Sequence, residues 1–187
     1  MPYTLYYFDA CRSFWGRAIG VVLTLEDAGA EYEIRDISDA PQGRFTFPNI
    51  TLSTGETIGQ VPAILNILGN RFDLTGRTGV EKIMCQQAVL DLDDIFINAQ
   101  NGKLSKNPER ATQWFSLLEN KLAENRFLVS DAPTVADFHA VFATEWVHRG
   151  YAADAYNAHP RLAQWWKDIC AHPPVTKMKA GDIPMIP

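Results

Sequence analysis

FPNITLSTGETIGQVPAILNIL, residues 47–68, decides the fold predicted for this 187-residue chain. Two short runs rich in β-branched residues flank the turn Ser53-Thr54-Gly55, which predicts a hairpin. An apolar helix follows, and Pro62 is expected at its first position, where proline is tolerated. The start of a helix presents backbone N–H groups without intrahelical partners, and these groups bind anions. The junction Gln60-Val61-Pro62 therefore predicts an anion site.

The residues before this stretch alternate strand and helix signals. Tyr3–Phe8 is aromatic and apolar, and Arg17–Ala28 carries apolar side chains close to a 3.6-residue period before Gly29. A second strand is expected after it, parallel to the first, with a right-handed crossover. We therefore predict the order β-α-β, loop, β-hairpin, α, over residues 3–8, 17–28, 31–36, 38–44, 47–52, 56–58 and 62–72.

Strand signals end at Gly76, and helical patterns follow. The predicted helices cover residues 79–100, 108–124, 133–147 and 160–171. The third of them begins with Thr134-Val135-Ala136-Asp137, which has the form of a capping box with a structural role, and is nearly all apolar, so it should be central and buried. We therefore expect an α/β domain over residues 1–74 and an all-helical domain over residues 79–187.

Composition limits the function classes. The chain is 47% hydrophobic and 21% charged with a net charge of −5, so we expect a globular protein without affinity for nucleic acid or anionic membranes. No apolar run approaches a membrane span and no leader is visible, so we expect a cytoplasmic protein. Cys11, Cys85 and Cys170 are far apart, and the four histidines lack ligand spacing, so neither a disulfide framework nor a metal is expected.

Four ordered segments resemble the cytosolic glutathione transferase family, in its tyrosine-type, sigma- or alpha-like classes. They are the first strand and helix start, the Phe47-Pro48 dipeptide, the strand-to-helix junction and the capping box, reading LYYF…GRA, FP, GQVPAIL and SDAPTVADF. The resemblance implies a thioredoxin-like domain that binds glutathione, followed by a helical domain that contributes a pocket for the second substrate. It also implies a homodimer.

By this resemblance, glutathione would lie against the hairpin and the helix that follows it. A cis bond at Phe47-Pro48 would present the Phe47 backbone to the peptide, and Gln60 and Val61 would meet the γ-glutamyl carboxylate. Val61 stands where the family usually has a hydroxyl, and one lost hydrogen bond to a charged group costs about 1.5–3 kcal/mol. Arg17 is a candidate to lie near the sulfur or the glycine end of glutathione, and Arg44 is a candidate for its glycine carboxylate. The alternatives are that Arg17 is solvated or bridges the two domains and that Arg44 is an exposed loop residue.

Tyr7 resembles the family's catalytic tyrosine, whose hydroxyl would stabilise the glutathione thiolate without adding charge. Tyr6, its neighbour in the strand, must point to the other face of the sheet. The next loop offers two other candidates, because Cys11 and Ser13 stand where other classes place a nucleophilic cysteine or an activating serine. Phe14, Trp15, Trp146 and Tyr151 are candidates for the second-substrate pocket. Asp91, Asp93 and Asp94 are candidates to reach the glutathione of the partner subunit.

The resulting hypothesis is a detoxifying glutathione transferase that conjugates its co-substrate glutathione to small electrophilic or hydrophobic molecules. One alternative is a non-catalytic member of the same fold that binds ligands or proteins, for which Val61 and the short glycine-end loop argue. A further alternative is a thiol transferase that depends on Cys11.

Overall fold

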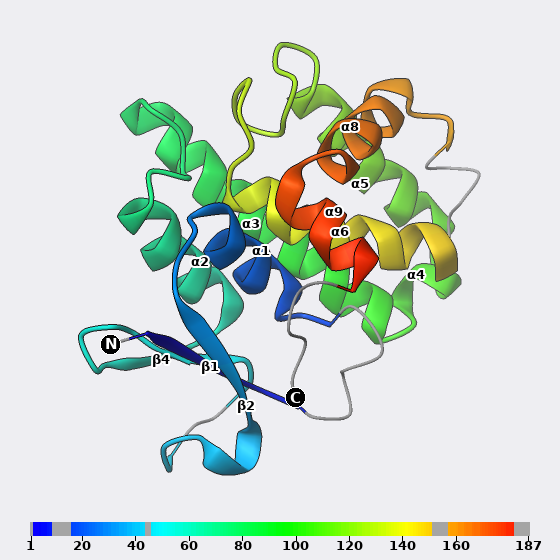
Figure 1. Cartoon of the computed structure of the whole chain (residues 1–187). Coiled ribbons are helices and arrows are strands. Elements are labelled where there is room, and N and C mark those ends of the chain that lie inside the picture. The colour runs from blue at the N-terminus through cyan, green and yellow to red at the C-terminus, as the bar shows by residue number, and fades with distance from the viewer. Residues whose placement is uncertain (1, 9–15, 44–45, 151–156, 182–187) are drawn as a thin grey trace.

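The computed structural model describes residues 2–8, 16–43, 46–150 and 157–181, without the side chains of residues 104, 105, 108 and 145–150. Two layers of helix lie on one side of a small sheet (Figure 1). The first layer is α1 (Ile19–Asp27) and α2 (Val61–Arg71), and the second contains the remaining helices. The chain is therefore a thioredoxin-like region followed by a helical domain, as the sequence predicts.

The sheet has four strands in the order β2-β1-β3-β4. β1 pairs in parallel with β2 and antiparallel with β3, and β3 pairs antiparallel with β4. The predicted order of strands and helices is confirmed, with strand ends that differ from the prediction by up to two residues. The strands are Tyr3–Tyr7, Tyr32–Asp36, Asn49–Thr51 and Thr57–Gly59.

Within the residues that the structure describes, the helical half contains the four predicted helices and two short ones that the sequence analysis did not predict. The predicted helices are α3 (Gly79–Gln100), α5 (Pro108–Lys121), α6 (Val135–Gly150) and α8 (Pro160–Cys170). The additional ones are α4 (Lys103–Lys106) and α9 (Pro173–Ala180). Both are too short for a periodic pattern to reveal them. A 3-10 turn, η2 (Ile37–Asp39), occupies part of the expected loop.

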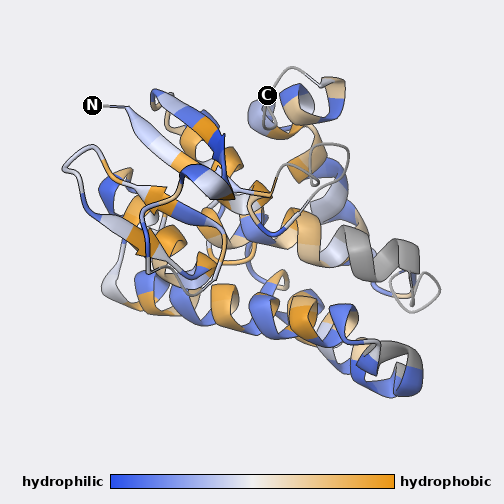
Figure 2. Cartoon of the chain, turned by 90° about the horizontal axis from the view of Figure 1, so that it is seen from below, coloured by the Kyte–Doolittle hydropathy of each residue, from blue (hydrophilic) through white to orange (hydrophobic). Residues whose placement is uncertain are grey.

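Helix α6 is central in the molecule and packs against both α1 and α3. Apolar residues recur along the strands and helices that meet there (Figure 2). Gly20 on α1 lies so close to α6 that a Cβ atom at this position would be 2.9 Å from the Cα atom of His139. The thioredoxin-like region therefore rests on the helical domain through direct backbone contact between α1 and α6.

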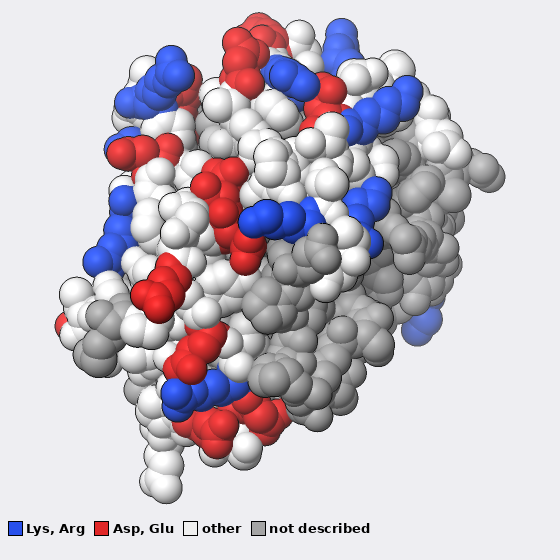
Figure 3. Space-filling view, in the orientation of Figure 1, with Lys and Arg blue, Asp and Glu red and all other residues white. Residues whose placement is uncertain are grey.

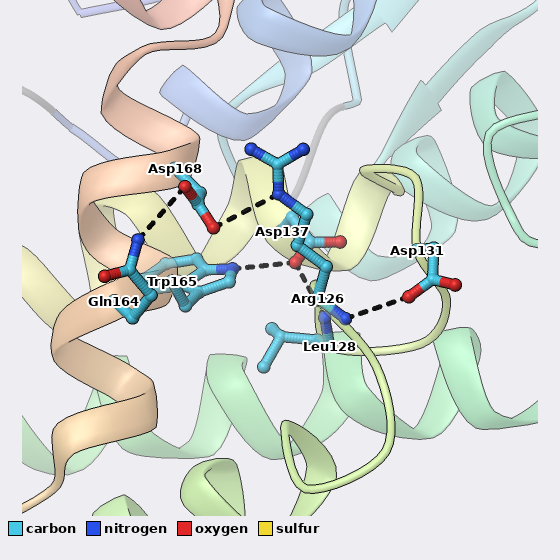
Figure 4. Close-up of polar contacts among 7 residues, drawn as sticks. All are labelled: Arg126, Leu128, Asp131, Asp137, Gln164, Trp165 and Asp168. Carbon is cyan, nitrogen blue, oxygen red and sulfur yellow. Dashed lines mark hydrogen bonds and ion pairs between the residues drawn. The ribbon is translucent and has the colours of Figure 1, made fainter.

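The carboxylate of Asp137 is completely buried near the start of α6 and accepts four hydrogen bonds, two of which, from Leu128 and Trp165, are drawn in Figure 4. Oδ2 accepts from the backbone N–H and the hydroxyl of Thr134, at 2.8 and 2.9 Å. Oδ1 accepts from the Leu128 N–H and the Trp165 indole N–H, at 2.9 and 2.8 Å. One of the two bonds of the expected capping box is present, because the Asp137 carboxylate accepts the Thr134 backbone N–H. The Thr134 hydroxyl donates to the same carboxylate instead of accepting the Asp137 N–H.

Burial raises the pKa of Asp137, whereas its four hydrogen bonds lower it. An unpaired buried donor costs about 1–3 kcal/mol. This one side chain thus joins the start of α6, the preceding loop and α8.

Asp137→Ala should lower the free energy of unfolding by about 3 kcal/mol or more, because it leaves several buried donors without an acceptor. Urea denaturation followed by circular dichroism measures the change. Asp131→Ala is the control, since Asp131 is exposed and accepts only the Arg126 N–H at 3.2 Å, and it should cost less than about 1 kcal/mol. Equal losses in the two variants would contradict a central role for Asp137.

Candidate functional site

Three segments meet at one edge of the sheet. In the strand register Tyr6 is opposite Asn49, and Asn49 is opposite Gly59. The end of β1 at Tyr7, the residues before β3 and the residues after β4 are therefore neighbours. The structure thus brings together Tyr7, Phe47-Pro48 and Gln60-Val61, the segments that the sequence analysis assigned to one ligand.

The Phe47-Pro48 peptide bond is cis, as the resemblance implied. Asn49, which follows it, is buried and donates its side-chain amide to the Thr46 carbonyl at 2.8 Å. A Cβ atom at Gly59 would lie 2.6 Å from Asn49 Oδ1, so the end of β4 approaches this loop closely. These contacts hold the backbone before β3 at the edge of the sheet.

The junction of β4 and α2 differs in detail from the prediction. Helix α2 begins at Val61, so Pro62 occupies the second helical position rather than the first. Helix geometry leaves the N–H groups of the first turn without intrahelical partners, and Pro62 has none to satisfy. The N–H groups of Val61 and Ala63 therefore lie at the helix start without intrahelical partners, an arrangement that is able to bind an anion.

Gln60 and Val61 play different structural parts. Gln60 is exposed and has φ 65° and ψ 114°, a left-handed backbone conformation that is rare outside glycine and that clusters at functional sites. The side chain of Val61 is only 2% exposed and belongs to the hydrophobic core. Position 61 thus contributes its backbone to the site and its side chain to packing.

The Tyr7 side chain is buried at the end of β1, with 9% of its surface exposed. Its phenol oxygen accepts a hydrogen bond from the Arg17 backbone N–H at 3.0 Å. A Cβ atom at Gly16 would lie 2.5 Å from that oxygen, so only glycine allows the chain to pass here. Phe8 packs edge-on between the Tyr7 and Phe47 rings, at centroid distances of 5.6 and 5.7 Å.

Arg17 turns its side chain away from the sheet and toward α3. The guanidinium lies 3.8 Å from Asp93 Oδ1 and 4.7 Å from the centre of the Phe96 ring. Arg17 thus bridges the two halves of the chain with its side chain, while its backbone N–H contacts Tyr7. This is the alternative that the sequence analysis set beside a direct contact with glutathione.

The acidic residues of α3 separate into different environments. Asp93 lies 3.9 Å from Nε2 of His139 on α6 as well as close to Arg17, whereas Asp91 lies 3.8 Å from the Lys121 ammonium and Asp94 is exposed. Sequence analysis did not select His139. The sequence feature that could have indicated it is a histidine within the mostly apolar first turns of α6.

Burial perturbs the two groups that face Arg17. It raises the pKa of Asp93, an effect that the Arg17 charge opposes and the Asp94 charge reinforces. Burial, together with the Arg17 charge, lowers the pKa of His139 to about 4. His139 is therefore neutral at neutral pH.

Several predicted site residues lie outside the described part of the chain. The side chain of Trp146 on α6 is one, and the others are Cys11, Ser13, Phe14, Trp15, Arg44 and Tyr151. A pocket of about 260 Å³ does lie between α2 and α3, beside the start of α2. Its walls include Pro62, Ala63, Asn66, Thr75, Cys85 and Leu90.

Two further properties concern the described residues only. They contain no group of three or more His, Cys, Asp or Glu side chains placed to hold a metal ion. Nor is any of their helices both long and apolar enough to cross a membrane.

Comparison with known proteins supports the reading of the fold. The family model described as "Glutathione S-transferase, C-terminal domain" matches residues 90–173. Glutathione S-transferase F6 of Arabidopsis thaliana is 23% identical over 131 residues, which are 70% of this chain and 60% of that protein. Glutathione S-transferase F13 of the same plant is 28% identical over 78 residues, 42% of this chain and 36% of that protein. The chain thus spans at most about three-fifths of these relatives.

Solved structures resemble the whole chain. The glutathione S-transferase from Ascaris lumbricoides has a TM-score of 0.80 at 22% identity, with 97% of this chain and 98% of that one covered. The monomeric Na-GST-3 from the hookworm Necator americanus has a TM-score of 0.76 at 21% identity, with 97% of both chains covered. The fold is therefore that of glutathione transferases.

The sequence match in the helical domain and the fold of the entire chain agree. Residues 90–173 thus match the C-terminal domain of glutathione S-transferases, and the chain as a whole has the fold of those proteins.

His139 should make the stability of this protein depend on pH. The pKa of His139 is about 4 in the folded protein and 6.5 for an unperturbed histidine, as in the unfolded chain. Between pH 4 and 6.5 the imidazole is therefore protonated in the unfolded chain but not in the folded protein. The stability that neutral His139 contributes is complete above pH 6.5 and is lost as the pH falls toward 4, by up to about 1.4 kcal/mol per pH unit.

Denaturant unfolding between pH 7 and about 4.5 measures this slope. His139→Gln should flatten it, and His159→Gln, which removes a partly exposed imidazole, is the control and should not. A slope in His139→Gln that equals the wild-type slope would assign the pH dependence to other groups.

Proposed function

We propose that this protein is a glutathione transferase that binds glutathione at the edge of the sheet and conjugates its sulfur to small electrophiles. The observation that carries the proposal is the position of the Tyr7 phenol. It lies at the end of β1, fixed by the Arg17 N–H, at the same edge as the cis Phe47-Pro48 bond and the start of α2.

The ligand would span these three segments. The γ-glutamyl carboxylate would meet the N–H groups at the start of α2, where the helix dipole favours an anion, and Gln60 would bind beside it. The Phe47 backbone, presented by the cis bond, would pair with the peptide part of glutathione. Arg17 would act near the sulfur through its backbone contact with Tyr7, and Arg44 is proposed for the glycine carboxylate.

The chemistry follows from the acidity of a thiol. A free thiol has a pKa of about 8.5, so only a small part is ionised near pH 7. The Tyr7 oxygen accepts the Arg17 N–H and carries its own proton, which it can donate to sulfur. The thiolate then forms a bond to the electrophilic carbon, and the leaving group departs with its electron pair. No covalent intermediate with the protein is involved.

The second substrate is proposed to lie over the helical domain, near Phe14, Trp15, Trp146 and Tyr151. We place the reaction in the cytoplasm and assign it to detoxification. Figure 3 shows acidic and basic side chains interspersed on one face, unlike the one-signed patch that binds nucleic acid.

One observation favours a second candidate function. The side chain of Val61 is part of the core and offers no hydroxyl to the γ-glutamyl carboxylate. A member of the fold that binds a different ligand without catalysis would also show this feature. The Cys11-dependent thiol transferase remains a further hypothesis, which retained activity in Cys11→Ala would dismiss.

Tyr7→Phe should lower kcat for conjugation of a standard electrophile by about 10- to 100-fold, because it removes one hydrogen bond to a developing charge. Glutathione affinity, measured by calorimetric titration, should change much less. Tyr6→Phe alters the other face of β1 and is the matched control. Unchanged turnover in Tyr7→Phe would remove Tyr7 from this role, and no glutathione binding by the wild type at millimolar concentration would favour the non-catalytic alternative.

Variants of Val61 test the proposed contact between the γ-glutamyl carboxylate and the start of α2. Val61→Ser adds the hydroxyl and should tighten glutathione binding by about tenfold, at some cost in stability. Val61→Ala makes a similar cavity without a hydroxyl, so it separates the new hydrogen bond from the loss of packing. Equal glutathione affinity in both variants would show that a hydroxyl at position 61 does not reach the carboxylate.

We also propose that two copies of the chain associate through α3. Apolar side chains on its outer surface and on α2 are unusually exposed, between 36% and 71%, and apolar patches of this kind mark interfaces. They are Ile67, Val80, Ile83, Met84 and Leu90. The related Na-GST-3 is described as monomeric, so association needs a direct test.

Sedimentation analysis should show a dimer for the wild type. Ile83→Asp should weaken the dimer by about thirtyfold or more, because it buries a charge in the apolar contact. Asn120→Asp adds the same charge at an exposed position of α5 and is the control. A wild type that sediments as a monomer at every concentration would refute the dimer but leave the glutathione site untouched.

A further inference from the structure

A buried polar cluster joins the residue Arg17, just before α1, to α3 and α6. Asp93 Oδ1 and His139 Nε2 are buried, and among the described residues neither has a hydrogen-bond partner. They lie 3.9 Å apart, and Arg17 Nη2 is 3.8 Å from the same Asp93 oxygen. Buried polar atoms without partners are rare in folded proteins, so this meeting of three side chains requires an explanation.

The charges of the three groups are complementary. Arg17 is always a cation, and Asp93 has 17% of its side-chain surface exposed and lies beside it. His139 is neutral at neutral pH, and a neutral imidazole donates from one nitrogen and accepts at the other. With a carboxylate opposite Nε2, the favoured tautomer carries its proton there. The Asp93 carboxylate thus faces both the Arg17 cation and the His139 N–H.

The distances from Asp93 to Arg17 and to His139 indicate the kind of interaction between them. Distances of 3.8 and 3.9 Å exceed a direct hydrogen bond. Charge–charge attraction acts between Arg17 and Asp93, whereas neutral His139 interacts with Asp93 as a dipole or through one bridging water. The Phe96 ring lies under the guanidinium and restricts it to the side of α3. Exposed Asp94 is the other charged group that acts on Asp93.

One member of the cluster, Arg17, also contacts Tyr7. The Arg17 side chain is held on α3, and its backbone N–H donates to the Tyr7 oxygen. Gly20, which follows on α1, packs against the His139 backbone, so the start of α1 is also fixed on α6. A shift of the Arg17 side chain would therefore move the N–H donor relative to the phenol.

We propose that Asp93 and His139 are positioning residues, which hold Arg17 so that its backbone N–H is aligned with the Tyr7 oxygen. The helical domain thereby sets the geometry of the phenol that lies in the other half of the chain. The catalytic consequence rests on the proposed glutathione transferase function, whereas the alignment itself does not.

The test begins without glutathione. Amide hydrogen exchange of Arg17, followed by NMR, reports the bond to Tyr7, and Tyr7→Phe identifies the protection that depends on the phenol. Asp93→Asn keeps the shape and removes the charge, and it should speed Arg17 exchange by about tenfold. Asp93→Glu, which restores the charge, should recover part of the protection. Asp73→Asn, an exposed acid between α2 and α3, is the control.

The second readout uses bound glutathione. In Asp93→Asn the ultraviolet absorbance of the thiolate should titrate at higher pH than in the wild type. The kcat should fall by several-fold, with KM for glutathione changed less than about twofold, because a positioning residue affects the reacting state more than binding. His139→Gln removes the contact from the α6 side and should change both readouts in the same direction.

The outcomes separate the two proposals. Arg17 exchange in Asp93→Asn within about twofold of the wild type would overturn the positioning role, because that bond would not depend on the cluster. Faster exchange with an unshifted thiolate titration would overturn its catalytic consequence. A wild type that binds no glutathione would refute the proposed function, and the exchange measurement would still decide the alignment.

Discussion

The buried carboxylate of Asp137 is the interaction on which the rest of the structure depends. Its four hydrogen bonds join the start of α6 to the loop before it and to Trp165 on α8. Burying a carboxylate is costly unless its oxygens are paired, so the fully paired Asp137 favours one geometry for the helical domain. Because α6 is the helix on which α1 packs, the same constraint sets the position of the thioredoxin-like region.

A short series of packing and polar contacts connects α6 to the candidate site. The close approach of Gly20 to His139 fixes α1, and the Arg17 guanidinium between Asp93 and Phe96 fixes its start. The Arg17 N–H then meets the Tyr7 oxygen, which Gly16 allows by the lack of a side chain. These contacts connect the end of β1 at the sheet edge to the helical half of the molecule.

The order of elements was predictable because it depends on local patterns. The 22-residue helix α3, the hairpin of β3 and β4, and the first helix all follow from apolar periodicity and turn residues. The cis bond at Pro48 came from resemblance, since the dipeptide alone does not specify it. Helices α4 and α9 were missed because four and eight residues carry too little periodicity, and α2 begins one residue earlier than expected because proline is also tolerated in the second position.

The sequence by itself determined the two-part architecture, the candidate tyrosine and the missing hydroxyl at Val61. Only the tertiary structure decided that the Val61 side chain lies in the core and that the Arg17 side chain points to Asp93 on α3. It also decided that His139 meets Asp93 across two helices. The physical reason is that propensity and periodicity act over a few residues, whereas the direction and burial of a side chain depend on contacts between segments that are distant in the chain.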